Sequence, residues 1–360
     1  MSSNSLGKIY RLTTFGESHG KAIGGIIDGC PAGIELTEVD IQQDLDRRKP
    51  GQSSVTTERK ESDIVQLLSG TFEGKTTGTS IGFIIPNKDQ RSKDYSAIKD
   101  VYRPSHADFT YESKYGIRDY RGGGRSSARE TANWVVGGAV AQKIINTVEI
   151  DISCYVSKVG SIEMLESDSF FTDAEVDVSI VRCPNQSVST KMIALIEETK
   201  KQGDSIGGAV SVVIKNDVVG LGRPIFNKLS ADLSHALFSI NAVKSVEIGI
   251  GKSTTELKGS EQNDAFTIEN GKVKTSSNNS GGVQGGISNG QDILITISFK
   301  PPATISQKQF TVSTSNEQVD IEVEGRHDPC VVPRAVPVVK AICAMVLADH
   351  LLLKRTGKIE

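Results

Sequence analysis

The sequence predicts an α+β protein, and three observations lead to that class. Segments with strand character and segments with helical character come in blocks rather than in regular alternation, which disfavours a parallel doubly wound sheet. The chain contains no internal repeat and no low-complexity linker. Its 360 residues, 37% hydrophobic and 24% charged, suffice for one large domain with an extensive core or for about two smaller units.

The first element with two recognisable ends is a helix predicted at Thr37–Arg48. Thr37 and Asp40 stand in the spacing of a capping box, and helical periodicity follows until Pro50-Gly51 stops it. The predicted helix therefore ends in a basic patch, Arg47-Arg48-Lys49.

Strands and a long polar stretch flank that helix in the sequence. An apparent strand at Ile9–Thr14 precedes it, and a second strand is predicted at Gly78–Pro86. The residues that follow, Asn87–Arg125, are rich in Arg, Lys, Asp and Tyr, so we expect a long loop there. A loop of this length inside a compact domain is usually functional.

The rest of the chain supplies most of the predicted core. Ser127 and Glu130 again stand three residues apart, and the apolar spacing beyond them predicts a helix of about twenty residues from near Ser127. Its small residues Gly137, Gly138 and Ala139 would let another helix approach closely. The remaining predicted elements are strands at Val148–Lys158, Ala209–Val219 and Asp292–Phe299, and helices at Thr190–Lys201, Leu229–Lys244 and Ala335–Lys354.

Charge and composition argue against several classes of protein. The 41 Lys+Arg and 44 Asp+Glu residues give a formal charge of -3, so any anion-binding site must come from local clusters. Met1–Lys8 lacks the apolar core of a signal peptide, and the most apolar stretch, Ala335–Leu353, carries Lys340, Asp349 and His350. We therefore expect a cytoplasmic protein that binds neither nucleic acid nor membrane. The five cysteines are far apart and form no CxxC pair, which disfavours zinc and a disulfide framework.

Two of the five histidines lie in short loop motifs that suit proton transfer. The first motif, Gly16-Glu17-Ser18-His19-Gly20, places a histidine between glycines, where the backbone can approach a ligand. The second, Arg103-Pro104-Ser105-His106-Ala107-Asp108, combines a candidate phosphate ligand with a candidate proton donor. Each motif by itself is as compatible with an ordinary turn, in which the histidine is a capping or solvated residue.

An arginine-rich motif leads into the predicted helix near Ser127. Arg118, Arg121, Arg125 and Arg129 converge on three glycines and a helix start, where free backbone N–H groups and the helix dipole favour an anion. A phosphate or carboxylate site is the favoured interpretation. The alternatives are arginines that merely solvate a loop and an RNA-binding Arg-Gly segment, although such RNA-binding segments are repetitive and disordered.

Two further motifs lie in the C-terminal third. The glycine-rich stretch Ser280–Gly290 is followed by a strand and by Lys300-Pro-Pro-Ala-Thr304, a combination that suits a flat ring or a phosphate but also a flexible hairpin. The motif Gly325-Arg326-His327-Asp328-Pro329-Cys330 precedes the last helix. Its Arg, His and Asp can serve as anion clamp, acid and base, or as a capping salt-bridge cluster.

Together these motifs resemble the chorismate synthase family. The resemblance rests on GESHGKAIGGIIDGCPAG at 16–33, RPSHAD at 103–108, GGGRSSARETANWVVGGAV at 122–140, SINAVKSVEIG at 239–249 and GRHDPC at 325–330. It runs in order from about Gly7 to Leu353. The resemblance implies a single catalytic domain over 1–360, with a helical layer sandwiched between antiparallel β-sheets, and a homotetramer.

The resemblance also implies a reaction. Members of this family convert 5-enolpyruvylshikimate 3-phosphate to chorismate by a 1,4-anti elimination of phosphate and a ring proton, in the shikimate pathway of aromatic amino acid biosynthesis. The reaction requires reduced FMN and has no net redox change. Because no second domain is left over for a flavin reductase, an external flavin reductase is expected, with NADPH as an indirect reductant. The alternative is an intrinsic reductase activity within the same fold.

Site residues follow from the resemblance position by position. His19 resembles the histidine that protonates the departing phosphate, with Ser18 beside it, and His106 resembles the one that governs flavin protonation. Asp328 resembles the aspartate that acts through flavin N5 on the ring proton, with Ser127 in the same relay. Substrate phosphate and carboxylates would be held by Arg48, Arg103 and Arg129. FMN would be held by Arg125, Ser126, Ser127, Asn241, Ala242, Gly285, Lys300, Pro301, Pro302, Ala303, Thr304 and Arg326.

The sequence departs from the family pattern at two positions. Ser54 stands where many members have a second arginine, and Lys340 replaces a glutamate common in the last helix. We expect Lys340 to be a structural substitution with a compensating partner.

The alternative function is a non-catalytic anion- or RNA-binding module. A redox flavoenzyme with its own reductant site would need a GxGxxG between a strand and a helix, and the sequence has none.

Overall fold

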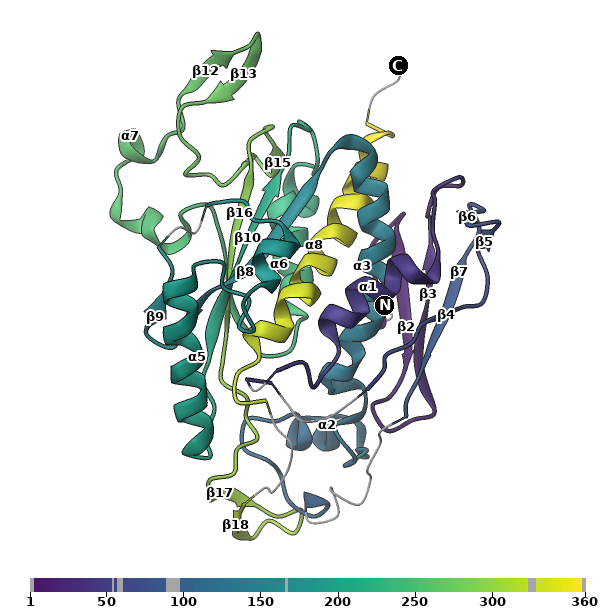
Figure 1. The fold of residues 1–360 in the computed structure, drawn as a ribbon, viewed down its shortest axis with the longest axis vertical. Helices are drawn as coiled ribbons and strands as arrows, with labels where there is room; N and C mark the ends of the chain where they lie inside the picture. Colours follow the sequence, from purple (N-terminus) through teal and green to yellow (C-terminus); the bar gives the residue numbers. More distant parts are fainter. Residues whose placement is uncertain are drawn as a thin grey trace.

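The computed structural model describes residues 3–53, 55–56, 61–88, 98–165, 168–322 and 328–357. Two five-stranded antiparallel sheets lie on either side of a layer of helices, as Figure 1 shows. Helices of this layer contact strands of both sheets. The arrangement confirms the predicted α+β class and the helical layer between antiparallel sheets.

The first sheet carries the turn that contains His19. Its strands, in spatial order, are β1 (Ser5–Leu6), β2 (Arg11–Gly16), β3 (Ala22–Asp28), β7 (Ile81–Pro86) and β4 (Gln66–Leu67). Alternate residues of β7 are buried, as expected for a sheet with one face on the core. Because β2 pairs with β3 up to the Gly16–Ile23 pair, the intervening turn lies at the end of the sheet.

The second sheet is more deeply enclosed. Its strands, in spatial order, are β11 (Val243–Ile248), β16 (Ile293–Phe299), β10 (Gly208–Lys215), β8 (Asp151–Val159) and β9 (Ile162–Glu163). The central strands β8 and β10 are buried along most of their length. The cause lies in their neighbours, since α8 (Val332–Lys354) contacts both strands, while α4 (Asp173–Asp177) and α5 (Gln186–Lys201) also contact β8.

The helical layer is built around a close contact between α3 (Thr131–Ile145) and α8. A Cβ at Gly138 would lie 2.2 Å from the Cβ of Ala341, so only glycine lets the two helices approach this closely. The close helix approach predicted for the glycines of α3 is therefore confirmed, with α8 as the partner. The helix α1 (Glu38–Arg48) packs against both members of this pair, and α6 (Leu229–Phe238) packs against α8.

The last helix belongs to the core. By length and composition α8 could cross a membrane, yet 89% of its most apolar window is buried within this fold. Lys340 lies on this helix, and its Nζ is 2.6 Å from Asp173 Oδ2. The compensating partner expected for Lys340 is thus present. Ser54, the other departure from the family pattern, lies outside the described residues.

Most predicted elements are confirmed, with shifted ends. The capping box of α1 is formed by Thr37 and Asp40. The predicted polar loop 87–125, however, contains a helix, α2 (Asp108–Tyr115), which ends at Gly116 in the left-handed conformation. Polarity concealed this helix, because its first residue, Asp108, is buried against arginines rather than against apolar side chains.

Two predicted helices have different ends from those expected. The residues after Ser127 form a 3-10 turn, η3 (Ala128–Glu130), and the α-helix begins only at Thr131. The helix predicted at Leu229–Lys244 ends at Phe238, and β11 begins at Val243. Ala242, with φ of +69°, has left the helical conformation at this junction.

The remaining elements are short and peripheral. They are the strand pairs β5 (Thr71–Phe72) with β6 (Lys75–Thr76), β12 (Phe266–Glu269) with β13 (Lys272–Thr275), β14 (Val283–Gln284) with β15 (Ile287–Ser288) and β17 (Gln309–Val312) with β18 (Gln318–Ile321), the helix α7 (Gly259–Gln262), and the 3-10 turns η2 (Gly124–Ser126), η4 (Asn146–Val148), η5 (Ile225–Asn227) and η6 (Gly251–Glu256).

Candidate active site

The two predicted histidine motifs meet at the glycine loop that precedes η2. His19 and Ser18 are buried in the turn between β2 and β3. A Cβ at Gly122 would lie 2.6 Å from His19 Nε2, and one at Gly123 would lie 3.2 Å from His106 Cε1. Both glycines have positive φ, +70° and +88°. Neighbouring residues of one loop therefore pack against both histidines, along a path that favours glycine.

His106 is held by a buried arginine–aspartate pair from its own motif. Arg103 donates through Nε and Nη2 to the two oxygens of Asp108, both at 2.8 Å. The Nδ1 atom of His106 lies 3.0 Å from Asp108 Oδ1 and 3.0 Å from Arg103 Nη2. In the neutral ring, the protonation of Nδ1 decides which of these groups it bonds, and Nε2 takes the opposite role.

Asp108 stays ionised in this environment. Burial raises the pKa of its carboxyl group, but hydrogen bonds from Arg103 and His106 outweigh burial and hold the pKa well below its ordinary value. A permanent negative charge is therefore fixed beside the imidazole, 3.0 Å from its Nδ1 atom.

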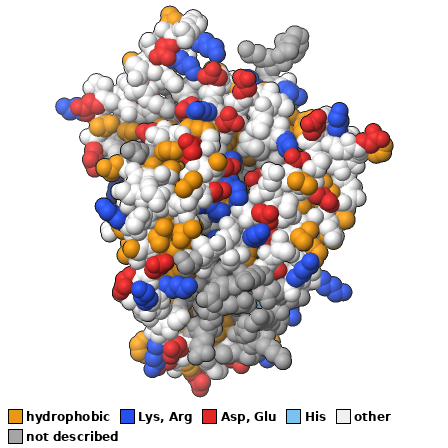
Figure 2. Space-filling model, viewed as in Figure 1, with side chains coloured by type: hydrophobic (Ala, Val, Ile, Leu, Met, Phe, Trp, Pro, Cys, Tyr) orange, Lys and Arg blue, Asp and Glu red, His pale blue; other side chains and the backbone are white. Residues whose placement is uncertain are grey.

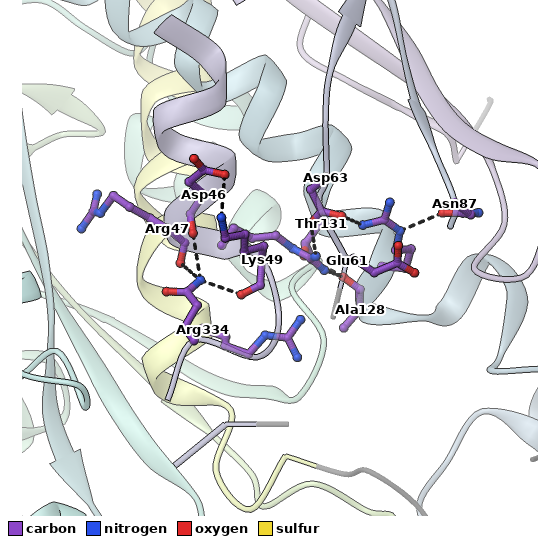
Figure 3. A network of polar contacts seen from close by, with 12 residues as sticks. Asp46, Arg47, Lys49, Glu61, Asp63, Asn87, Ala128, Thr131 and Arg334 are labelled. Carbon is purple, nitrogen blue, oxygen red and sulfur yellow. Dashed lines mark hydrogen bonds and ion pairs between the residues drawn. The ribbon is translucent and has the colours of Figure 1, made fainter. Parts of the chain in front are cut away.

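A second buried ion cluster joins residues far apart in the chain (Figure 3). Arg48, at the end of α1, donates to Asp63 Oδ2 at 3.1 Å, and Arg129 donates to the other oxygen of the same carboxylate. Arg48 is fixed further by its bonds to Thr131 Oγ1, at 3.1 Å, and to the carbonyl of Ala128, at 2.5 Å. We call Arg48, Asp63 and Arg129 the arginine cluster.

Asn87 connects the arginine cluster to the turn that carries His19. Arg129 Nε donates to Asn87 Oδ1 at 2.9 Å. The amide nitrogen of Asn87 donates in turn to the carbonyls of Glu17 and Gly20, at 3.0 and 2.9 Å. The cluster is thus hydrogen-bonded to the backbone on both sides of His19.

The arginine cluster keeps a net positive charge. Burial lowers the pKa of Arg48 to about 9, while Asp63 opposes that fall. The guanidinium nevertheless stays charged at neutral pH. For Asp63, burial raises the pKa, but the charges of Arg48 and Arg129 lower it further, so the carboxylate is ionised. Two cations around one anion suit the binding of a further anionic group.

Of the site residues predicted in the motif Gly325–Cys330, Asp328 is the one that lies within the described residues. Its Oδ2 lies 2.5 Å from Nη1 of Arg334, near the start of α8. After burial, the charge of Arg334 also contributes to the lowered pKa of Arg48, so Arg334 acts electrostatically on the arginine cluster. Arg334 lines a cavity of about 300 Å³ together with residues of α1. Arg326 and His327 lie outside the described residues.

Several predicted cofactor residues gather next to the second histidine motif. Asn241 Nδ2 donates to the carbonyl of Ser126 at 2.9 Å. The backbone N–H of Lys300 donates to Ala242 O at 2.9 Å, and its Nζ donates to Ser105 O at 2.9 Å. Four segments that are separated in the sequence therefore meet at one place.

Backbone and charge at this place suit an anionic ligand. Ala242 holds a left-handed φ without being glycine, a strained conformation that is common at binding sites. Burial and the neighbouring Lys244 both lower the pKa of Lys300. A phosphate beside the two ammonium groups would relieve their mutual repulsion.

Other predicted cofactor residues are placed differently. Gly285 lies in the turn between β14 and β15, and the following residue accepts a hydrogen bond from Leu229, at the start of α6. Asn241 follows the other end of that helix, so about 15 Å of helix separates the two positions. Pro302–Thr304, which follow Lys300, are half-buried.

The four arginines of the arginine-rich motif are engaged within the protein. Arg118 pairs with Asp108 and Glu112, Arg121 with Asp119, Arg125 with Glu130, and Arg129 with Asp63. The Arg125 guanidinium also donates to the carbonyl of Gly16 at 3.0 Å, and so faces β2. On the face that Figure 2 shows, basic side chains are interspersed with acidic ones. These pairings argue against the exposed basic tract that the RNA-binding alternative requires.

Sequence reasoning missed Asp63, Asn87 and Arg334. None of them belongs to a motif with recognisable spacing. The partners of Asp63 and Asn87 are distant in sequence, and Arg334 lies one residue before the predicted start of the last helix. The only signal for Asn87 was its position at the first residue of the long polar stretch. For Asp63, the left-handed φ of +47° would have been informative, but it is visible only in the fold.

Comparison with known proteins gives a consistent result. A family model described as chorismate synthase matches residues 10–352. A relative from Christiangramia forsetii, named chorismate synthase, is 55% identical over 359 residues, covering 100% of both chains. One of the same name from Parabacteroides distasonis is 56% identical over 353 residues, 98% of this chain and 99% of the relative. A solved structure described as "Crystal Structure of Chorismate Synthase" matches with a TM-score of 0.76 and 31% identity, over 97% of this chain and 93% of the other.

Proposed function

The chain belongs to the chorismate synthase family, and on this premise we propose how its described residues carry out the reaction. The enzyme is a carbon–oxygen lyase that removes phosphate and a ring proton from 5-enolpyruvylshikimate 3-phosphate to give chorismate, in aromatic amino acid biosynthesis. One observation supports the site most strongly. A single glycine loop contacts His19 and His106, and the turn of His19 is hydrogen-bonded to the arginine cluster.

We propose that His19 protonates the phosphate as it leaves, with Ser18 as its supporting neighbour. An allylic phosphate leaves more readily when its charge is neutralised and a proton is supplied. Arg48 and Arg129 would neutralise that charge, because the arginine cluster has a net positive charge and is linked through Asn87 to the His19 turn. The buried position of His19 excludes bulk water from the proton transfer.

His106 and Arg103 would act as one unit. Asp108 and Arg103 hold the imidazole through Nδ1, which leaves Nε2 available for proton exchange with a neighbouring cofactor. Arg103 commits Nε and Nη2 to this unit, so it would reach a substrate carboxylate through its remaining nitrogen. Asp328 would receive the ring proton, with Arg334 holding its carboxylate in place and Ser127 completing the relay.

The described residues fit a bound FMN. The strained backbone at Ala242 and the repelling Lys244 and Lys300 suit a phosphate group. The cofactor would be held by Ser126, Ser127, Asn241 and Lys300–Thr304. Arg125 would contribute its backbone rather than its side chain. Gly285 and Arg326 are the remaining residues proposed to contact FMN. Reduced FMN, when bound, supplies an electron-rich ring that can stabilise the electron-poor centre left by the phosphate.

We further propose the setting in which the enzyme works. A single catalytic domain over 1–360 is supported by one hydrophobic core that takes in both sheets and the helical layer. A homotetramer in the cytoplasm, supplied with reduced FMN by an external flavin reductase and with NADPH as an indirect reductant, is the arrangement that the family membership favours.

Anaerobic turnover tests the proposed function directly. 5-Enolpyruvylshikimate 3-phosphate is incubated with the protein and photoreduced FMN, while phosphate release and chorismate absorbance are followed, and the assay is repeated with NADPH as the only reductant. We expect phosphate and chorismate to appear together with reduced FMN only. Activity with NADPH alone would contradict the need for an external reductase, and absence of product in both assays would refute the lyase.

A further inference from the structure

One carboxylate lies between the two arginines to which we assign the substrate phosphate. The side chain of Asp63 is 0% exposed, and the side chains of Arg48 and Arg129 are each 3% exposed. Each carboxylate oxygen binds a different guanidinium, so the carboxylate bridges the pair. Asp63 achieves this with a left-handed φ of +47°, which a non-glycine residue adopts only when its surroundings compensate.

The hydrogen bonds of the two arginines show what Asp63 leaves available. Arg48 uses Nε, Nη1 and Nη2 for Thr131, Asp63 and Ala128. Arg129 uses Nε and Nη1 for Asn87 and Asp63, while its buried Nη2 has no hydrogen-bond partner among the described residues. A buried guanidinium nitrogen without a partner is costly, and an anionic ligand would satisfy it.

We propose that Asp63 is a positioning residue of the substrate anion site. It holds Arg48 and Arg129 in one fixed arrangement and turns Arg129 Nη2 into the donor that receives the phosphate, while Asn87 keeps this donor in register with the His19 turn. The inference rests on the roles proposed above for Arg48, Arg129 and His19.

The physical reason is preorganisation. Two like charges buried side by side repel each other, and each loses hydration. A single bridging carboxylate offsets that repulsion without cancelling the positive charge, so the pair is in place before the substrate arrives. Its effect on Arg48 agrees with this role, since Asp63 opposes the fall in the pKa of that guanidinium.

A purely structural ion cluster is the competing explanation, and the two differ in what they predict. If Asp63 only stabilised the fold, its loss would weaken every ligand together with the fold. If it positions the phosphate donors, its loss should weaken the substrate selectively. The measurements must therefore compare substrate affinity, FMN affinity and melting temperature in the same variant.

The test uses Asp63→Asn in the full-length protein. The amide keeps the shape but presents N–H groups to one guanidinium, so we expect the dissociation constant of 5-enolpyruvylshikimate 3-phosphate, measured by calorimetry, to rise at least tenfold. KM should rise more than kcat falls, and FMN affinity should stay within about twofold of the wild type. Asp63→Glu should recover part of the substrate affinity, because it restores the charge.

Asp264→Asn is the matched control. Asp264 is also a buried aspartate, but it accepts from Ser277 Oγ and from the backbone N–H groups of residues 279 and 280, not from arginine. It should bind substrate as the wild type does. Wild-type substrate affinity in Asp63→Asn, or an equal loss of FMN affinity, would overturn the inference.

Two provisions keep the outcome decisive. If Asp63→Asn does not fold, Asp63→Glu takes its place, and the inference then requires weaker substrate binding with FMN affinity retained; wild-type substrate affinity would overturn it. Failure of the proposed function is recognised separately, because it would appear as a wild-type protein that forms no chorismate.

Discussion

The site contains two buried aspartate–arginine groups that are built in opposite ways. Asp108 pairs with Arg103 five residues away and encloses His106 within the same motif. Asp63 pairs with Arg48, 15 residues away, and with Arg129, 66 residues away. The first group is a local unit that a short segment brings together, whereas the second exists only when α1, η3 and the segment around Asp63 are all in place.

This difference separates two tasks. The local unit orients an imidazole through Nδ1, a task that depends on neighbours within a few ångströms. The arginine cluster must hold two cations at a distance that suits one anion, so it needs a rigid frame of several elements. Four changes would test whether this division is correct, beginning with the largest expected effect.

Arg129→Ala should cost the most. It leaves one oxygen of the buried Asp63 without its cation, and breaking a buried pair in this way destabilises a protein by about 3 to 5 kcal/mol. We expect a lower melting temperature together with a much larger substrate dissociation constant, measured by calorimetric titration. Asp217 offers a control, because it is an exposed aspartate that pairs with Lys272 and Lys274, and Asp217→Asn should change neither quantity. An unaltered substrate affinity in Arg129→Ala would remove this residue from the phosphate site.

Asp108→Asn should act on turnover rather than on substrate affinity. The amide keeps one oxygen for Arg103 but removes the charge beside His106, so the contacts that hold the ring at Nδ1 are weakened. We expect kcat with saturating substrate and reduced FMN to fall roughly 10²-fold, as is typical when a proton-transfer group is disabled. A rise in KM at constant kcat would show instead that the local unit acts only through the contact of Arg103 with substrate, and would erase the contrast with the arginine cluster.

Gly122→Ala addresses the loop that joins the two histidines. Its Cβ would lie 2.6 Å from His19 at a φ of +70°, whereas the same change at Gly116, at φ of +71°, would meet nothing within 4 Å. Gly116→Ala should therefore cost only the left-handed strain of about 1 to 2 kcal/mol in the free energy of unfolding. Gly122→Ala should add a loss of turnover, since His19 must move. Equal activity in the two variants would mean that the packing against His19 has no role.

Acid pH should reduce the stability that the ion pairs of Asp63 and Asp108 contribute to the fold. The pKa values of Asp63 and Asp108 are lowered in the folded protein, so their contribution to stability is complete above the ordinary aspartate value of 3.8 and is lost as pH falls below it. Each carboxylate can cost up to about 1.4 kcal/mol per pH unit in that window. Urea unfolding between pH 5 and 3 measures the slope, which should be shallower in Asp108→Asn. An identical slope would contradict the assigned pKa direction.

The same contrast explains how much the sequence could predict. The class, the helix Thr37–Arg48, the two histidine loops and the Arg103–Asp108 motif depend on spacing within a few residues, so they could be predicted. Asp63 could not, because its role is defined by two partners brought near it by tertiary folding. The end of α6 could not be predicted for a related reason. The left-handed conformation of Ala242 is stabilised by its contact with Lys300, which is distant in the sequence.

The glycine contact between α3 and α8 gives the site a mechanical property. Gly138 lies seven residues beyond Thr131, and Ala341 lies seven residues beyond Arg334. Thr131 and Arg334 are therefore each about 10 Å along their helix from the point where α3 and α8 touch. A tilt of about 5° between the two helices at this contact would displace Thr131 and Arg334, which contact Arg48 and Asp328, by about 1 Å. Displacements of that size can reduce catalysis about 10²-fold. A substitution between apolar residues at this contact, two helical turns from any charged group of the site, would thus change the catalytic rate by changing the helix tilt alone.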